Sequence, residues 1–222
     1  METAPLISDL AEITLRSLRV SVTAVILAAA IGIPFGAWLA VTRFGGRRAA
    51  VAVLNALMGL PPVVVGLVLY LLLSRSGPLG VLDLLFTTWA MILAQVIIVL
   101  PLIASLSHQV LRDLWAEYRD LLVSLGATRR QRIWVLIWDA RRSLLTAVLA
   151  AFGRAVGEVG AILIVGGNID HLTRVLTTAV TLEVSKGNLT FAVALGAVLI
   201  VISLAVSLAL HALSKAERVR PW

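Results

Sequence analysis

Five long apolar runs, separated by polar or charged loops, constrain what this chain of 222 residues can fold into. Each run is close to the roughly 20 residues that an α-helix needs to cross a bilayer. The runs cover Val20 to Val41, Ala49 to Leu73, Leu84 to Leu106, Ser143 to Gly167 and Leu189 to Leu213. They predict an all-α integral membrane protein with five transmembrane helices, because lipid leaves backbone polar groups no partner outside the segment.

Composition excludes an ordinary soluble domain. Hydrophobic residues make up 60% of the chain and charged residues only 14%, against roughly 25% charged in soluble domains. The net charge of +7 does not indicate nucleic-acid binding, because the basic residues lie in the loops between apolar runs. The absence of cysteine and the wide spacing of the three histidines predict no metal site.

The distribution of lysine and arginine predicts the orientation. Thirteen of them lie in the loop 43–48, the loop 112–142 and the tail 214–222, whereas five lie on the opposite side. By the positive-inside rule the thirteen face the cytoplasm, which places the N-terminus outside and the C-terminus inside. Arg16 and Arg19 oppose this rule, although an acidic leader partly offsets them. Residues 1–19 are then a periplasmic or interfacial segment, residues 20–213 the membrane domain, and 214–222 a cytoplasmic tail.

The leader does not have the form of a cleaved signal peptide. It carries Glu2, Asp9 and Glu12, and the apolar run that follows is longer than a signal peptide requires. We therefore expect the first helix to be retained.

The long basic loop contains two helical stretches. Apolar residues from Leu114 to Leu125 alternate with charged ones at amphipathic spacing, Gly126 stops or bends the helix, and a second stretch runs from Thr128 toward Trp138. Periodicity alone leaves two interpretations open. The first is a helix on the membrane surface, and the second is a docking helix for a soluble partner.

The same loop resembles the coupling loop of ABC importer permeases. That family's consensus is Glu-Ala-Ala, three residues, Gly, nine residues, then Ile-x-Leu-Pro. Asp120, Gly126, Leu136 and Trp138 fall in register with it, but Leu121 and Leu122 replace the two alanines and Asp139 replaces the closing proline. The resemblance assigns ATPase coupling to six residues, namely Asp120, Leu121, Leu122, Leu125, Gly126 and Ala127.

Other segments resemble the oxyanion branch of these permeases, which handles sulfate, molybdate and tungstate. They include Leu60 to Gly66, Ser76 to Gly80, Ala94-Gln95 and Arg154 to Ala161. The stretch from Val165 to Glu183 is most similar to the tungstate members. The resemblance covers roughly Ile13 to Leu213 and implies the type I, MetI-like permease fold with a cytoplasmic coupling helix.

This resemblance implies several partners for a transport subunit that is not itself an enzyme. They are a second copy of the chain, two ABC ATPase subunits and a periplasmic oxyanion-binding protein. No Gly-x4-Gly-Lys-Ser/Thr loop exists to hold phosphates, so no catalytic residue or cofactor is expected in this chain, and ATP and Mg belong to the partner ATPase. Tungstate is the expected cargo, with molybdate or sulfate as the alternative.

A different class of function is a self-sufficient one, either an ion-coupled secondary transporter or a membrane enzyme. A secondary transporter of this kind usually contains internal repeats, and the chain has no duplicated half. For an enzyme, the only candidate acidic group is Glu158 beside Arg154.

Polar residues inside the apolar runs are candidate pathway residues, because burial of charge in lipid is costly. Arg154 and Glu158 are four residues apart and can pair, either to fix helix packing or to offset the charge of an anion in transit. Asn55 and Gln95 predict either hydrogen bonds between helices or pathway lining. The adjacent prolines Pro61 and Pro62 predict a kink, which is either passive or a gate.

Overall fold

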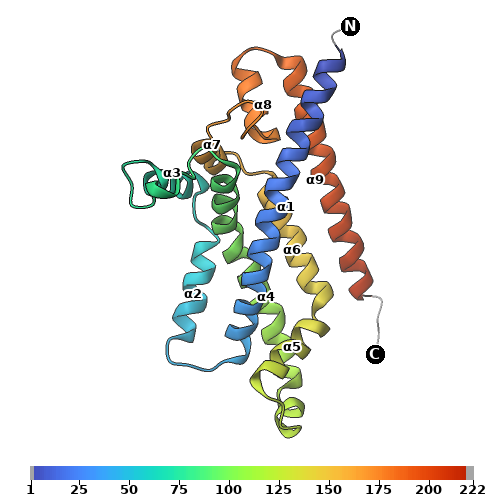
Figure 1. Ribbon diagram of the computed structural model, residues 1–222. Helices are drawn as coiled ribbons and strands as arrows, with labels where there is room; N and C mark the ends of the chain where they lie inside the picture. Colours follow the sequence, from blue (N-terminus) through green and yellow to red (C-terminus); the bar gives the residue numbers. More distant parts are fainter. Residues whose placement is uncertain (1–2, 219–222) are drawn as a thin grey trace.

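The protein is described by a computed structural model, which covers residues 3–218 and the side chains of residues 8–212. Glu2 of the leader and Arg220 of the tail lie outside the described residues. Throughout the described range the regular elements are helices (Figure 1). They are α1 (Thr3–Val41), α2 (Arg47–Leu57), α3 (Pro62–Leu73), the 3-10 turn η1 (Gly80–Leu82), α4 (Thr88–Ser124), α5 (Arg129–Asp139), α6 (Arg141–Val156), α7 (Gly160–Gly166), α8 (Leu176–Ser185) and α9 (Leu189–Arg218).

Three of the described helices, α1, α4 and α9, are each long and apolar enough to cross a membrane. Two bent pairs bring the number of candidate spans to five, with α2 and α3 meeting at 97° and α6 and α7 at 60°. The second and fourth apolar runs of the sequence correspond to these pairs. The chain bends at Pro61-Pro62, where the prolines predicted a kink, but the break between Val156 and Gly160 has no proline and was not anticipated.

Two helices extend well beyond the apolar runs that predicted them. The helix α1 begins at Thr3, so the described part of the segment before Val20 continues the first span as helix. The helix α4 has 37 residues and ends at Ser124, so the amphipathic stretch expected from Leu114 is its last part. Force on that end of α4 therefore acts on a helix that also crosses the membrane.

The centre of the bundle is the contact between α1 and α4 (Figure 1). A stripe of small residues on α1 recurs every four positions and includes Ala28, Gly32 and Gly36. A Cβ added at Gly36 would lie 2.6 Å from the carbonyl oxygen of Ala104, so only glycine permits this approach. Small residues of this kind let helix backbones pack closely in membranes.

The short helices α3 and α7 also pack through small residues. A Cβ added at Gly66 of α3 would lie 2.8 Å from the Cα of Ala161 in α7. Figure 1 shows α3 projecting sideways from the long helices. Its outer face is apolar and exposed, and includes Val63, Leu67 and Leu71. The two bends thus bring two half-helices together beside the bundle.

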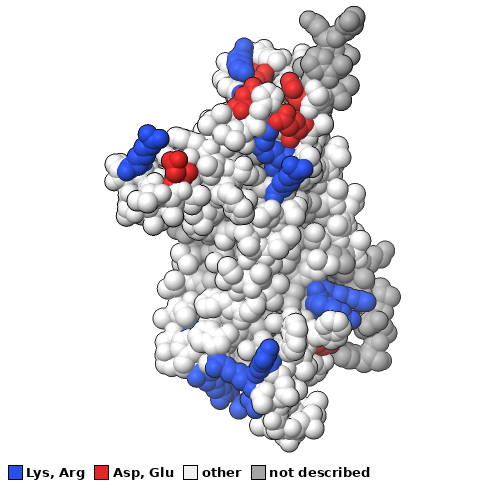
Figure 2. Space-filling view, viewed as in Figure 1, with Lys and Arg blue, Asp and Glu red and all other residues white. Residues whose placement is uncertain are grey.

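Charged side chains lie mainly toward the two ends of the molecule, with a broad uncharged band between them on the face shown in Figure 2. At the end that carries α8, Arg16 of α1 forms an ion pair with Glu12. Its guanidinium also donates to the carbonyl oxygens of His171 (2.7 Å) and Arg174 (3.2 Å). Asp170 pairs with Arg174 at 2.7 Å. Arg16, which opposes the positive-inside rule, is therefore neutralised within the protein.

Candidate coupling and translocation sites

The turn between α4 and α5 is closed by backbone hydrogen bonds that require a left-handed residue. The N–H of Gly126 donates to Val123 (3.0 Å) and that of Ala127 donates to Leu122 (3.1 Å), which is the Schellman pattern of a helix C-terminus. Gly126 has φ of +67°, a conformation that costs a side-chain-bearing residue energy. Thr128 and Gln131 then form a capping box that starts α5. The two helices form a hairpin, and we call its tip, residues 120–127, the elbow.

The elbow exposes some of its expected apolar anchors and buries another. Leu121 is 59% exposed and Leu125 71% exposed, whereas Leu122 is 8% exposed. The reason is helical geometry: Leu121 and Leu125 are four residues apart and share a face, while Leu122 points inward. Asp120 and Gly126 are exposed as well. The elbow therefore presents an apolar pair beside an acidic group.

Aromatic and basic groups tie this hairpin to the rest of the bundle. Arg129 donates to the hydroxyl of Thr42 and lies over the ring of Trp38, 5.7 Å from its centroid. Within the hairpin itself, Arg132 donates to the carbonyl oxygen of Ala127 at 2.7 Å. Leu136 is fully buried in a cluster with α1 and α4 residues. Movement of the hairpin would therefore be passed to the end of α1.

The break between α6 and α7 is organised by a buried carboxylate. Glu158 is 4% exposed in its side chain, and one oxygen accepts from the N–H of Ala161 at 3.2 Å, in the first turn of α7. The other oxygen lies 3.7 Å from Nη1 of Arg154. Thr177 of α8 donates its hydroxyl to the Glu158 carbonyl oxygen at 2.8 Å. The expected pair forms, but Glu158 lies beyond the end of α6 and not within a continuous helix.

Gln95 joins three helices near this break. Its amide nitrogen donates to the carbonyl oxygen of Ala155 in α6 (2.9 Å) and to the hydroxyl of Ser21 in α1 (3.2 Å). Since Gln95 is 1% exposed, these hydrogen bonds lie inside the packing of the three helices.

Asn55 makes a comparable link between α2 and α4. Its side-chain oxygen accepts a 2.5 Å hydrogen bond from Ser105. Asn55 is itself exposed, which leaves it open to a second contact.

The prolines at the other break stand at the start of α3. Pro61 precedes α3 and Pro62 occupies its first turn, where a missing N–H costs nothing because that group has no intrahelical partner.

The described residues contain no group of three or more His, Cys, Asp or Glu that could hold a metal ion.

The family model for binding-protein-dependent transport system inner membrane components matches residues 32–219. The chain belongs to this family of ABC importer permeases. The permease is therefore a multi-pass membrane protein and a transport subunit, and its family works with a separate ATPase and a substrate-binding partner.

Two similar proteins carry informative names. One is a "Probable anion ABC transporter permease protein" of Haloferax volcanii, 45% identical over 89% of this chain and 88% of its own length. Another is a "Tungstate uptake system permease protein TupB" of Peptoclostridium acidaminophilum, 41% identical over 90% of this chain and 87% of its own length.

A solved structure shares the fold. It is titled "Inward facing conformations of the MetNI methionine ABC transporter" and aligns with a TM-score of 0.77 at 19% identity, covering 96% of this chain and 98% of that one. The predicted MetI-like permease fold is confirmed.

Sequence reasoning missed two features of these sites. The first is the break after α6, for which the closely spaced Gly153, Gly157 and Gly160 were an available signal. The second is the support that Thr177 gives to Glu158 from another helix. No local pattern indicates such a contact, because the two residues are 19 positions apart.

Proposed function

We propose that this permease carries a tetrahedral oxyanion, tungstate, into the cell as part of an ATP-driven importer. The observation that supports tungstate is similarity: relatives named tungstate permeases are 41% and 37% identical. Relatives named for molybdenum and sulfate transport are 30% and 31% identical. Molybdate and sulfate are therefore the alternative cargoes.

The elbow is the proposed docking site for the ATPase. Leu121 and Leu125 are large apolar side chains exposed at the tip of a helical hairpin, with Asp120 beside them. Apolar anchors one helical turn apart suit insertion into a groove of a partner. Because each chain offers one elbow, two ATPases require two permeases, and we propose a homodimer. The exposed apolar face of α3 is available for contact with a second copy.

Arg154 is the proposed guide for the anion. Its side chain is 44% exposed, whereas its partner Glu158 is 4% exposed and held by the first turn of α7. A half-exposed guanidinium next to a fixed carboxylate can turn toward a passing dianion without unfolding the break. Pro61 and Pro62, at the facing break, are proposed as a gate because the adjoining α3 packs on α7.

The orientation proposed from the lysine and arginine distribution places the elbow and the C-terminus in the cytoplasm. The chain has no cysteine, so a single introduced one reports its side without background. Gly45 suits this test, because a Cβ there meets nothing within 4 Å and its φ is not positive. We expect Gly45→Cys to react with a membrane-impermeant maleimide only after cell lysis. Labelling in intact cells would show that residue 45 lies outside the cell, opposite to the proposed orientation.

Uptake of labelled anion tests the function. The gene is expressed in cells that lack their own molybdate and tungstate uptake, together with the genes for its ATPase and binding protein. We expect ATP-dependent accumulation of tungstate that requires all three components and that excess sulfate does not suppress. If excess sulfate suppressed uptake as strongly as excess unlabelled tungstate does, tungstate would be rejected as the cargo. Uphill transport by the permease alone in liposomes would reject the ATP-driven mechanism.

A further inference from the structure

A pocket of about 290 Å³ lies on the elbow side, where the end of α1 and the start of α2 meet the last part of α4. Figure 2 shows basic side chains gathered at this end of the molecule. The charged residues that line the pocket are Arg43, Arg47, Arg112, Arg119 and Asp120. We call it the arginine pocket. Four cations and one carboxylate thus surround a single space.

Ion pairs leave most of this positive charge unbalanced. Arg112 lies 2.9 Å from a carboxylate oxygen of Asp113. The ion pairs between described side chains include none of Arg43, Arg47 and Arg119. The one carboxylate of the lining cannot balance three cations. Like charges held around one space repel each other, and an anion between them would remove that cost.

Arg47 is held in place by groups that do not neutralise it. Its Nε donates to the carbonyl oxygen of Leu39 at 2.7 Å, and its Nη2 lies 3.2 Å from Nε2 of His108. The His108 side chain is itself buried, at 3% exposure. A guanidinium carries five N–H donors, so these two contacts leave others for the pocket that Arg47 lines. Donors fixed in advance lose little freedom when a ligand binds.

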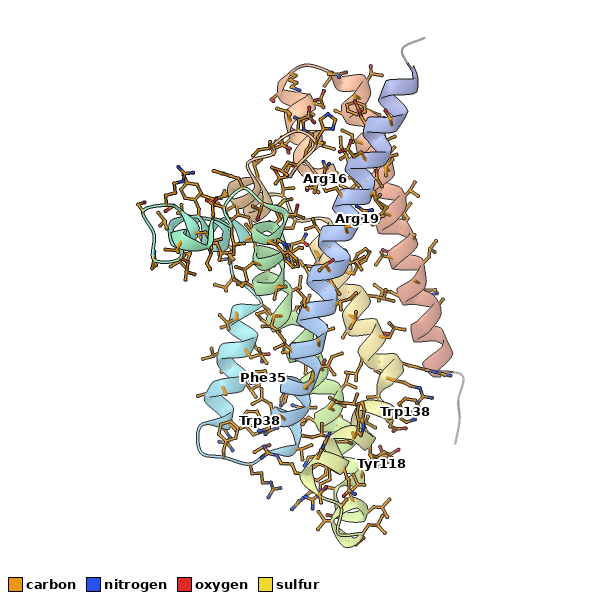
Figure 3. The ribbon with its side chains drawn as sticks, in the orientation of Figure 1. Arg16, Arg19, Phe35, Trp38, Tyr118 and Trp138 are labelled. Carbon is orange, nitrogen blue, oxygen red and sulfur yellow. The ribbon has the colours of Figure 1, made fainter. Side chains whose placement is uncertain are left out.

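Aromatic side chains place the arginine pocket near the membrane surface. The ring centroid of Trp38 lies 5.9 Å from that of Phe35 and 5.1 Å from that of Phe44. Figure 3 shows Phe35 and Trp38 near the end of α1 that leads into the α1–α2 loop. Tryptophan is enriched where the apolar core of a membrane meets the headgroups. Arg43 follows the last residue of α1, Val41, so the pocket lies on the polar side of this level.

We propose that the arginine pocket binds a tetrahedral oxyanion group on the elbow side of the membrane. Guanidinium groups donate paired hydrogen bonds to the oxygens of such a group. Two sources of the group can reach this level: a free inorganic oxyanion in the aqueous phase, and the phosphate of a lipid headgroup. The site does not depend on which anion is transported, nor on the role of Arg154.

Thermal unfolding of the full chain in neutral detergent micelles tests the proposal, because a ligand that binds only the folded state raises its stability. One arm adds inorganic phosphate, with sodium chloride at the same ionic strength as its reference. The other arm adds phosphatidic acid, with phosphatidylcholine as its reference. We expect the unfolding temperature to rise above the reference in at least one arm. A rise with inorganic phosphate identifies a free oxyanion as sufficient, and a rise with phosphatidic acid alone identifies the lipid headgroup.

A pair of substitutions assigns the effect to the arginine pocket. Arg47 also links α2 to α1, so the pocket variant is Arg43→Gln/Arg119→Gln, in which both original side chains are exposed. We expect the probe concentration for half of the full shift to increase at least about tenfold, as for the loss of one charge-assisted hydrogen bond. The matched control Arg130→Gln/Arg142→Gln removes the same charge from two exposed arginines outside the lining. It should keep the shift of the unmodified chain.

Three results would overturn the site. Equal loss of the shift in the pocket variant and in its matched control would show a general effect of charge. A shift that Arg154→Ala abolishes and the pocket variant keeps would place the bound anion at the break between α6 and α7. The third is no rise in either arm. If the pocket variant then also failed to pull down the ATPase, these arginines would be assigned to contact with the ATPase.

Discussion

The elbow at Gly126 and the break at Gly157 are both bends that contain glycine and have an acidic residue nearby. They differ in which side chains they expose and which they bury. The elbow exposes apolar Leu121 and Leu125. The break buries the carboxylate of Glu158 and satisfies it with groups of its own chain. Apolar side chains at a loop tip suit a partner, whereas a buried charge needs internal pairing. The comparison separates a surface that we propose serves another protein from a break whose buried charge is paired within the chain.

The break includes one unsatisfied group. The side-chain oxygen of Gln95 is buried without a hydrogen-bond partner, although its nitrogen serves α1 and α6. A buried acceptor left unpaired costs free energy.

The largest expected effect is at the elbow. A Cβ added at Gly126 meets nothing within 4 Å, and Gly126 is exposed, so we expect Gly126→Trp to insert and fold with only the strain of φ at +67°, about 1–2 kcal/mol. Its bulk should instead obstruct the partner. We expect uptake to fall at least about tenfold, as for a lost docking anchor, while the ATPase still hydrolyses ATP. The assay is uptake and ATP hydrolysis in the same liposomes.

Gly126→Ala is the matched control, because alanine carries the same backbone strain without the bulk. If alanine uncouples transport as fully as tryptophan does, the turn matters and the docking surface does not. Normal coupled uptake in the tryptophan variant would remove the elbow from the mechanism altogether.

Neighbouring leucines sharpen the same comparison with a smaller effect on transport. Leu121→Ala should weaken ATPase binding and change stability by less than about 0.5 kcal/mol, because Leu121 is 59% exposed. Leu122→Ala should lower the free energy of unfolding by about 2–5 kcal/mol, because Leu122 is 8% exposed. It should affect ATPase binding less than Leu121→Ala does. Thermal unfolding and pull-down of the ATPase separate the two. If the two variants lost ATPase binding and stability to the same extent, the end of α4 would have to expose a different face from the one in this structure.

The difference between the two bends also explains what the sequence could predict. The elbow depends on neighbours in the chain, such as Gly126 and the Thr128–Gln131 box, so local patterns revealed it. The proline bend at Pro61 is local too. The break after α6 depends on Thr177 and Gln95, which reach it from other helices. Hydrophobic runs indicate that a segment is buried in lipid, but not where a distant side chain allows it to break.

Substitutions at Arg154 test whether the break between α6 and α7 has only a structural role or also guides the anion. Arg154→Ala removes a half-exposed cation, and we expect uptake to fall about five- to thirtyfold, equivalent to about 1–2 kcal/mol of lost attraction for the dianion. Arg154→Lys should recover part of it, because the charge remains. Glu158→Gln should keep the contact with the Ala161 N–H, since an amide oxygen also accepts. The double variant Arg154→Ala/Glu158→Ala is decisive: restored uptake would mean that the unpaired carboxylate caused the defect and that Arg154 is structural. Uptake that stays low in a double variant with unchanged thermal unfolding would assign the arginine to the path, because no unpaired carboxylate would then remain to explain the defect.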